Sequence, residues 1–155
     1  MGRLALVLGV LTVALAACGP AAQAPTDRQW LANANGLVQQ LRNDLVLSAA
    51  GGPDVPSARH ALADDSDLYD LLIAYSDFGG CNQMVGNIGA ASGRLVRVER
   101  TLTRACIPLE RASRLFSVAA SSNDPHALLS AGRIAQTAEA LLVRADLQLL
   151  TRSVR

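Results

Sequence analysis

Few side chains in this sequence are suited to catalysis or metal binding. The chain of 155 residues has two histidines, His60 and His126, and three cysteines. His60 and Asp64 stand four residues apart and Asp67 follows three residues later, so the three can share one helix face. A metal site needs more ligands in a fixed geometry, and we interpret this group as a solvated acidic face. We therefore expect neither a metal site nor a cofactor.

The sequence also lacks the patterns of common catalytic sites. It contains no nucleophile elbow and no phosphate-binding loop ending in Gly-Lys-Ser/Thr, and no strand pattern precedes its glycine-rich stretch at 79–93. We interpret that stretch as a structural loop. An enzyme would need a pocket where His60, Asp64 or Tyr69 converge with a strongly perturbed pKa. We therefore expect a protein that is not an enzyme.

One cysteine lies at the end of an export signal. Arg3 gives a short positive end, residues 4–14 are uncharged and mostly apolar, and small residues precede Cys18. The apolar run is too short to stay in a bilayer, which takes about 17–25 helical residues. Leu15-Ala16-Ala17-Cys18 resembles the lipobox of bacterial lipoproteins, in which an aliphatic residue and two small residues precede the lipidated cysteine. The resemblance implies that residues 1–17 are removed and that Cys18 carries a diacylglycerol.

The resemblance also implies where the protein is. A lipidated Cys18 would anchor the exported chain to the outer face of a bacterial cell membrane, because two or more acyl chains hold a protein stably on a bilayer. The alternative is an ordinary secreted protein cut after Ala17. Myristoylation at Gly2 would require Ser or Thr at the position that Leu6 occupies, and is excluded.

If Cys18 is acylated, an even number of thiols remains. Cys81 and Cys106 would then form a disulfide in an oxidising compartment. A disulfide that closes a loop of about 26 residues stabilises a fold by about 3–3.5 kcal/mol on the chain-entropy estimate. The alternative, a redox-active dithiol, lacks the Cys-x-x-Cys spacing that lowers a thiol pKa.

The composition favours helices that pack closely. Half of the residues are hydrophobic, many of them alanine, and only 3% are aromatic. Residues 18–25 are rich in Pro and Ala and predict a tether with a reach of about 20 Å. The rest, 26–155, predicts one all-α domain. Around Tyr75, Phe78, Cys81 and Ala105-Cys106 it resembles uncharacterised exported helical proteins of high-GC bacteria, a resemblance that implies no activity.

Apolar residues recur at spacings of three and four in four segments. They predict helices at about 26–51, 57–77, 94–120 and 124–149, arranged as an antiparallel four-helix bundle. Thr26 begins the first with a capping box. Asp64-Asp65-Ser66-Asp67 can cap a helix start, so the second is open to a break near Asp65. Pro108 should bend or interrupt the third helix, because proline lacks an amide hydrogen. Asp124 should cap the fourth.

Charge is unevenly distributed along the chain. All fourteen basic residues are arginine; residues 26–80 carry three Arg and eight Asp, whereas 81–155 carry ten Arg and five acids. Such asymmetry can mark a nucleic-acid or membrane surface. We expect instead that the acidic and basic segments lie against each other and compensate, and we expect no nucleic-acid partner.

The third predicted helix has an apolar side and a basic side. Its basic side carries Arg97, Arg100, Arg104, Arg111 and Arg114. With the short tether, this stripe can meet anionic lipid headgroups; the alternative is a solvated or acid-paired face. We thus expect a membrane-anchored, non-enzymatic envelope lipoprotein that binds an envelope protein or organises the cell surface. The alternative function is a carrier that holds a small apolar ligand between helices.

Overall fold

The computed structural model describes residues 24–153, and within that range all regular structure is helical. The elements are α1 (Asp27–Ser48), the 3-10 turn η1 (Ala49–Gly51), α2 (Val55–Ala63), α3 (Asp65–Gly79), α4 (Cys81–Asn87), α5 (Val96–Ser122), α6 (Pro125–Gln136) and α7 (Glu139–Ser153). The all-α prediction is confirmed. The predicted leader, the lipidated Cys18 and most of the tether lie outside the described residues.

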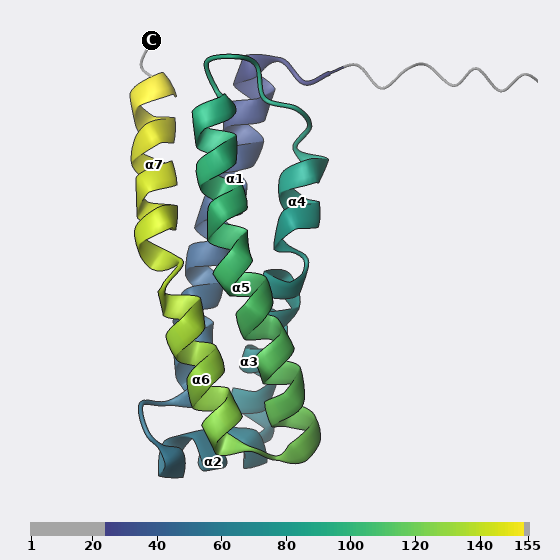
Figure 1. Cartoon of the computed structure of the whole chain (residues 1–155), viewed down its shortest axis with the longest axis vertical. Helices are drawn as coiled ribbons and strands as arrows, with labels where there is room; N and C mark the ends of the chain where they lie inside the picture. Colours follow the sequence, from purple (N-terminus) through teal and green to yellow (C-terminus); the bar gives the residue numbers. More distant parts are fainter. Residues whose placement is uncertain (1–23, 154–155) are drawn as a thin grey trace, which may run out of the picture.

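The long helices pack side by side in a closed ring. α1 packs on α3, α3 on α5, α5 on α6 and α7, and α7 back on α1. Figure 1 shows that α1 and α5 run in one direction while α3, α4, α6 and α7 run in the other. Neighbours in the ring are therefore antiparallel, and α2 crosses the end of the molecule where α1 stops.

Several helix ends follow from side-chain caps that the sequence predicts. Thr26 and Gln29 form the expected capping box at the start of α1. Asp64 ends α2 in an extended conformation, and its carboxylate accepts the amide hydrogens of Ser66 and Asp67 at the start of α3. The break expected near Asp65 is thus confirmed. Asp124 caps α6 in the same way, with Pro125 as the first helical residue.

The segment after Gly80 differs from the expected loop. Cys81–Asn87 forms the short helix α4, with Cys81, Val85 and the following Ile88 buried. These residues recur at spacings of four and three, so one side of α4 is apolar and packs against α5. The irregular chain is confined to 88–95, where Gly89 has a φ of 90°.

The last predicted helix is also divided. Thr137 ends α6, and its hydroxyl donates to the Ile134 carbonyl at 2.7 Å. Tighter turns that join residues three apart connect α6 to α7 at Thr137 and Ala138. Ala135, Ala138 and Leu142 are nevertheless all buried, so the apolar seam continues across the break.

Pro108 does not interrupt its helix. α5 is continuous from Val96 to Ser122 with Pro108 inside it, and it ends at Asn123, whose left-handed conformation (φ 51°) serves as the C-cap. Of the two outcomes predicted for Pro108, a bend or an interruption of the helix, the interruption is therefore wrong. The apolar side of α5 faces the centre of the ring, with Leu102, Leu109 and Phe116 buried.

The core combines small residues with one aromatic cluster. Tyr75 stacks on Phe116 with a centroid distance of 4.5 Å and meets the edge of Phe78 at 5.3 Å. Fully buried alanines line α1, α2, α5, α6 and α7, which lets the helices approach closely. These contacts fix the rotation of each helix and thereby decide which arginines face outward.

Candidate functional site

The predicted disulfide between Cys81 and Cys106 is confirmed. Both residues are fully buried, with their Cα atoms 5.3 Å apart, and the bond joins α4 to the middle of α5. Since α4 runs antiparallel to α5, Cys81 lies beside Cys106 without distortion of either helix. A fully buried disulfide is a structural link, and the fold gives it no access to a substrate.

All five arginines of the predicted basic stripe are exposed, but they do not form one site. Arg97, Arg100 and Arg104 line a groove between α5 and α7, and Arg144 of α7 joins them from the other side. The groove has a volume of about 440 Å³, and Leu141 and Gln148 also line it. Arg111 and Arg114 lie further along α5, outside the groove.

We define the basic groove by Arg97, Arg100, Arg104 and Arg144. Within residues 24–153 none of these four side chains forms an ion pair. Four guanidinium groups beside one another repel, and each offers donors in a planar fork that matches phosphate or carboxylate oxygens. The arrangement is therefore suited to an anionic surface or to several anionic groups at once.

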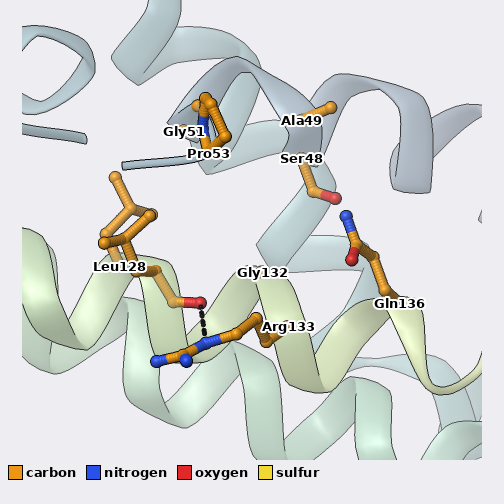
Figure 2. A pocket seen from close by; sticks show the side chains of 10 residues that line it. Ser48, Ala49, Gly51, Pro53, Leu128, Gly132, Arg133 and Gln136 are labelled. Atoms are coloured by element: carbon orange, nitrogen blue, oxygen red, sulfur yellow. Dashed lines mark hydrogen bonds between the residues drawn. The ribbon is translucent and has the colours of Figure 1, made fainter. Parts of the chain in front are cut away.

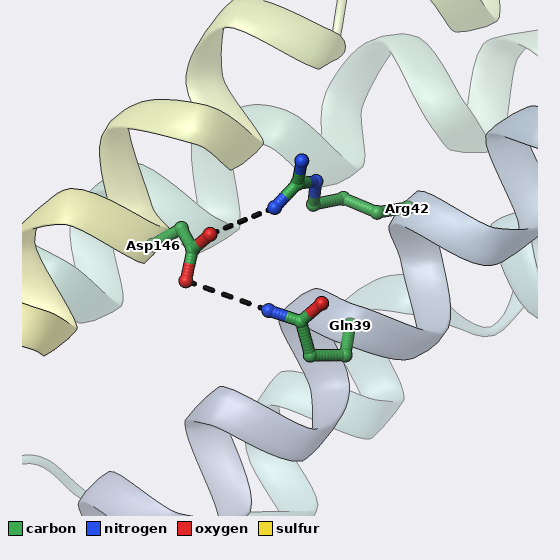
Figure 3. A network of polar contacts seen from close by, with 3 residues as sticks. All are labelled: Gln39, Arg42 and Asp146. Carbon is green, nitrogen blue, oxygen red and sulfur yellow. Dashed lines mark hydrogen bonds and ion pairs between the residues drawn. The ribbon is translucent and has the colours of Figure 1, made fainter.

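Two ion pairs form among the described residues, and neither involves an arginine of the groove. Arg94 meets Asp27 at 2.7 Å, and Arg42 meets Asp146 at 2.7 Å. Figure 3 shows that Asp146 of α7 also accepts a hydrogen bond from Gln39, so two side chains of α1 hold one carboxylate of α7. Only the Arg94–Asp27 pair joins an acid of 26–80 to an arginine of 81–155, as the expected compensation requires. In the Arg42–Asp146 pair the arginine belongs to 26–80 and the acid to 81–155. The arginines of the groove are outside this compensation.

The two ends of the bundle differ in charge. Figure 1 shows that α1 and α5 begin at the end where α7 stops. Three of the groove arginines belong to the first third of α5, and Arg144 belongs to α7, which lies in the same half of the molecule. The opposite end is formed by α2 and the start of α3. That end carries the acidic residues Asp54, Asp64, Asp65, Asp67 and Asp70. The basic end is thus also the end at which the chain enters from the predicted tether.

The histidines and their acidic neighbours do not line the basic groove. His60 and Tyr69 are exposed, and the Asp64 carboxylate is engaged by amide hydrogens of α3. His126 is exposed at the start of α6. Within residues 24–153 no three His, Cys, Asp or Glu side chains are placed to hold a metal ion.

A pair of carboxyl groups between α1 and α3 is the polar feature that sequence reasoning missed. Asp44 is only 4% exposed, and its Oδ2 has no hydrogen-bond partner among residues 24–153. Burial raises the pKa of Asp44 to about 7, helped by the charge of Asp77 and a hydrogen bond between the two carboxyl groups. Gln40 donates to Asp77 at 2.7 Å. Asp44 follows Leu37 and Leu41 at helical spacing, which is the sequence signal that it faces inward.

A second groove lies at the acidic end, between residues 48–53 and α6. It has a volume of about 480 Å³, and Figure 2 shows Leu128, Arg133 and Gln136 of α6 on one side of it and Ser48 and Pro53 on the other. Its polar groups are partly used within the protein. Ser48 donates to the Leu45 carbonyl at 2.8 Å, and the Nε of Arg133 donates to the Leu129 carbonyl. This groove offers no convergent set of free donors.

Comparison with known proteins assigns no family to these features. No protein-family model matches the chain, and no curated protein or solved structure matches it either. In the described part of the chain, no helix is long and apolar enough to cross a membrane.

Proposed function

We propose that this protein is an exported bacterial lipoprotein of the cell envelope, anchored through Cys18 and not an enzyme. Its antiparallel four-helix body follows a cleaved leader (residues 1–17) and a short tether (residues 18–25). The basic groove holds the body against anionic headgroups, and the acidic end stays free for an envelope partner to bind. The lipobox pattern of Leu15-Ala16-Ala17-Cys18 supports the anchor.

One observation supports the orientation of the body most strongly. Arg97, Arg100, Arg104 and Arg144 gather without ion pairs among the described residues, at the end where the chain enters from the tether. Each arginine held near an anionic leaflet contributes about 1 kcal/mol. A tether with a reach of about 20 Å keeps that end near the headgroups.

The alternative function, a carrier of a small apolar ligand, is supported less well. The seams between the helices are filled by buried alanine and leucine, such as Ala135, Ala138 and Leu142. The grooves described above are bordered by arginine and other polar side chains, whereas an apolar ligand needs a mostly apolar enclosure.

The anchor is tested by Cys18→Ser in the natural host. We expect the variant to lose membrane association or to remain unprocessed, because serine cannot carry the thioether-linked lipid. Ala17→Ser is the matched control, since serine keeps the lipobox pattern, and it should behave like the natural protein. A Cys18→Ser protein that is processed normally and stays equally membrane-bound would contradict the proposed function.

A further inference from the structure

The helix α7 carries apolar side chains on two sides, and the bundle covers only one of them. Leu142, Ala145 and Leu149 are buried in the core. Val143, Leu147 and Leu150 are 38%, 58% and 56% exposed, respectively. Their spacings of four and three place them on one side of the helix. We call these three residues the α7 ridge.

Arginines flank the α7 ridge. Arg144 directly follows Val143 and belongs to the basic groove, whose other arginines come from α5. On the side of α1, a further groove with a volume of about 550 Å³ is lined by Leu149 and Leu150 together with Arg28 and Arg152. An exposed apolar stripe bordered by arginine is the pattern of a helix that lies in the headgroup layer of a bilayer.

The position of α7 fits the predicted anchor. α7 ends at the same end of the bundle where α1 begins (Figure 1). The tether reaches about 20 Å, which is about two helix diameters. A lipid attached at Cys18 can therefore enter the same leaflet on which α7 lies, without straining the bundle.

We propose that the α7 ridge inserts its apolar side chains into the headgroup layer of an anionic leaflet while the arginines of the basic groove bind lipid phosphates. The inference rests on the proposed function and adds to it the face by which the body lies on the membrane. A second copy of the chain is a poorer occupant. Two ridges facing each other would also bring two sets of unpaired arginines together, and such like charges repel.

The test is a spin label at Leu147, introduced as Leu147→Cys in the full-length protein, purified from bacterial membranes and placed in vesicles containing phosphatidylglycerol. The sulfurs of Cys81 and Cys106 are bonded to each other, and an acylated Cys18 does not react. Leu72→Cys is the matched control. Leu72 is 49% exposed on α3, which packs on α1 and α5 as α7 does and therefore lies across the ring from α7.

Collisions with oxygen and with a water-soluble nickel chelate report the depth of each label. We expect the oxygen-to-nickel ratio to be several-fold higher at residue 147 than at residue 72, and equally raised for Val143→Cys. Equal ratios at 147 and 72 would overturn the inference. If the label at Leu150→Cys lies in the bilayer while the label at Val143→Cys lies in water, the bundle stands upright on the membrane. This outcome would also overturn the inference.

Two further outcomes separate the inference from the proposed function. Spin–spin broadening at residue 147 would show that a second copy covers the ridge and would overturn the inference alone. Labelling of the natural protein at Cys18 would show a sulfur without lipid and would contradict the proposed function. In that case the spin-label experiment is repeated on the Cys18→Ser form. An oxygen-to-nickel ratio that is higher at residue 147 than at residue 72 still supports insertion, and equal ratios overturn the inference.

Discussion

At the scale of single residues, the Asp44 and Asp77 pair couples the stability of the fold to pH. The Asp44 carboxyl group has a pKa of about 7 in the folded protein and 3.8 in the unfolded chain. Between these two pH values it therefore binds more protons in the folded state than in the unfolded state. The free energy of unfolding therefore falls as pH rises from about 4 to about 7, and it stays low above that range. The difference between the two pKa values corresponds to about 4 kcal/mol in the free energy of unfolding.

We expect Asp44→Asn to remove most of this pH dependence. The amide stays neutral and can still donate to the Asp77 carboxylate, so the variant should be more stable than the natural protein at pH 8, by about 2–4 kcal/mol. Urea unfolding at pH 5 and pH 8 measures the effect. Asp70→Asn, on the same helix as Asp77, serves as the control. A natural protein equally stable at both pH values would contradict this assignment.

Tyr75 gives a second prediction at this scale. Its hydroxyl is buried and has no hydrogen-bond partner in the described part of the chain, and burial raises the pKa of the phenol. Tyr75→Phe keeps the stacking on Phe116 and removes the unpaired group, so we expect a gain of about 1 kcal/mol in the free energy of unfolding. Tyr69→Phe, at an exposed position of α3, should change nothing. A loss of stability in Tyr75→Phe would show that the hydroxyl has a favourable role.

At the scale of helices, the disulfide stabilises α4, which is much shorter than the helices that form the ring. α4 has only seven residues, too few to be stable without tertiary contacts, and Cys81 links it to α5. The bond also joins α4 and α5 across the irregular segment 88–95.

We expect the double variant Cys81→Ser, Cys106→Ser to lose about 3 kcal/mol in the free energy of unfolding, because the unfolded chain gains the freedom of an open loop. Chemical unfolding measures this loss, and reduction of the natural protein should produce a similar one. A double variant as stable as the oxidised protein would show that packing alone holds α4 on α5.

The helices themselves were largely predictable, because their apolar spacing and caps are local features of the chain. Thr26, Asp64 and Asp124 indicated helix starts through short-range hydrogen bonds. The break at Thr137 was not predictable, since Ala135, Ala138 and Leu142 keep helical spacing across it. α4 was not predicted, because Gly86 and Gly89 have a low helix propensity and the helix is too short to form alone.

At the scale of the whole molecule, packing decides which arginines act together. The sequence grouped Arg111 and Arg114 with Arg97, because all lie on one side of α5. The structure separates them from the groove and adds Arg144, whose helix could not be placed beside α5 from sequence alone. The spacing of Leu142, Ala145 and Leu149 predicts that they share the buried seam and that Leu147 lies outside it, but spacing alone does not show whether another helix covers Leu147.

The basic groove should govern binding of the unacylated Cys18→Ser chain to anionic vesicles. Replacing Arg97, Arg104 and Arg144 by Gln should weaken this binding about a hundredfold, since each charge contributes about 1 kcal/mol and 1.4 kcal/mol is a factor of ten. The control variant replaces Arg111, Arg114 and Arg133, which removes the same charge outside the groove. Sedimentation with vesicles measures both. Equal weakening in the two variants would show that net charge, and not the groove, determines binding.

The central claim, that this is a lipid-anchored envelope protein, is tested most directly by the intact mass of the protein extracted from its own membrane. We predict a chain that begins at Cys18, carries the added mass of a diacylglycerol and, where the host adds one, a third acyl chain, and contains one disulfide. A mass that includes residues 1–17, or a chain that begins at Cys18 without acyl mass, would contradict the claim.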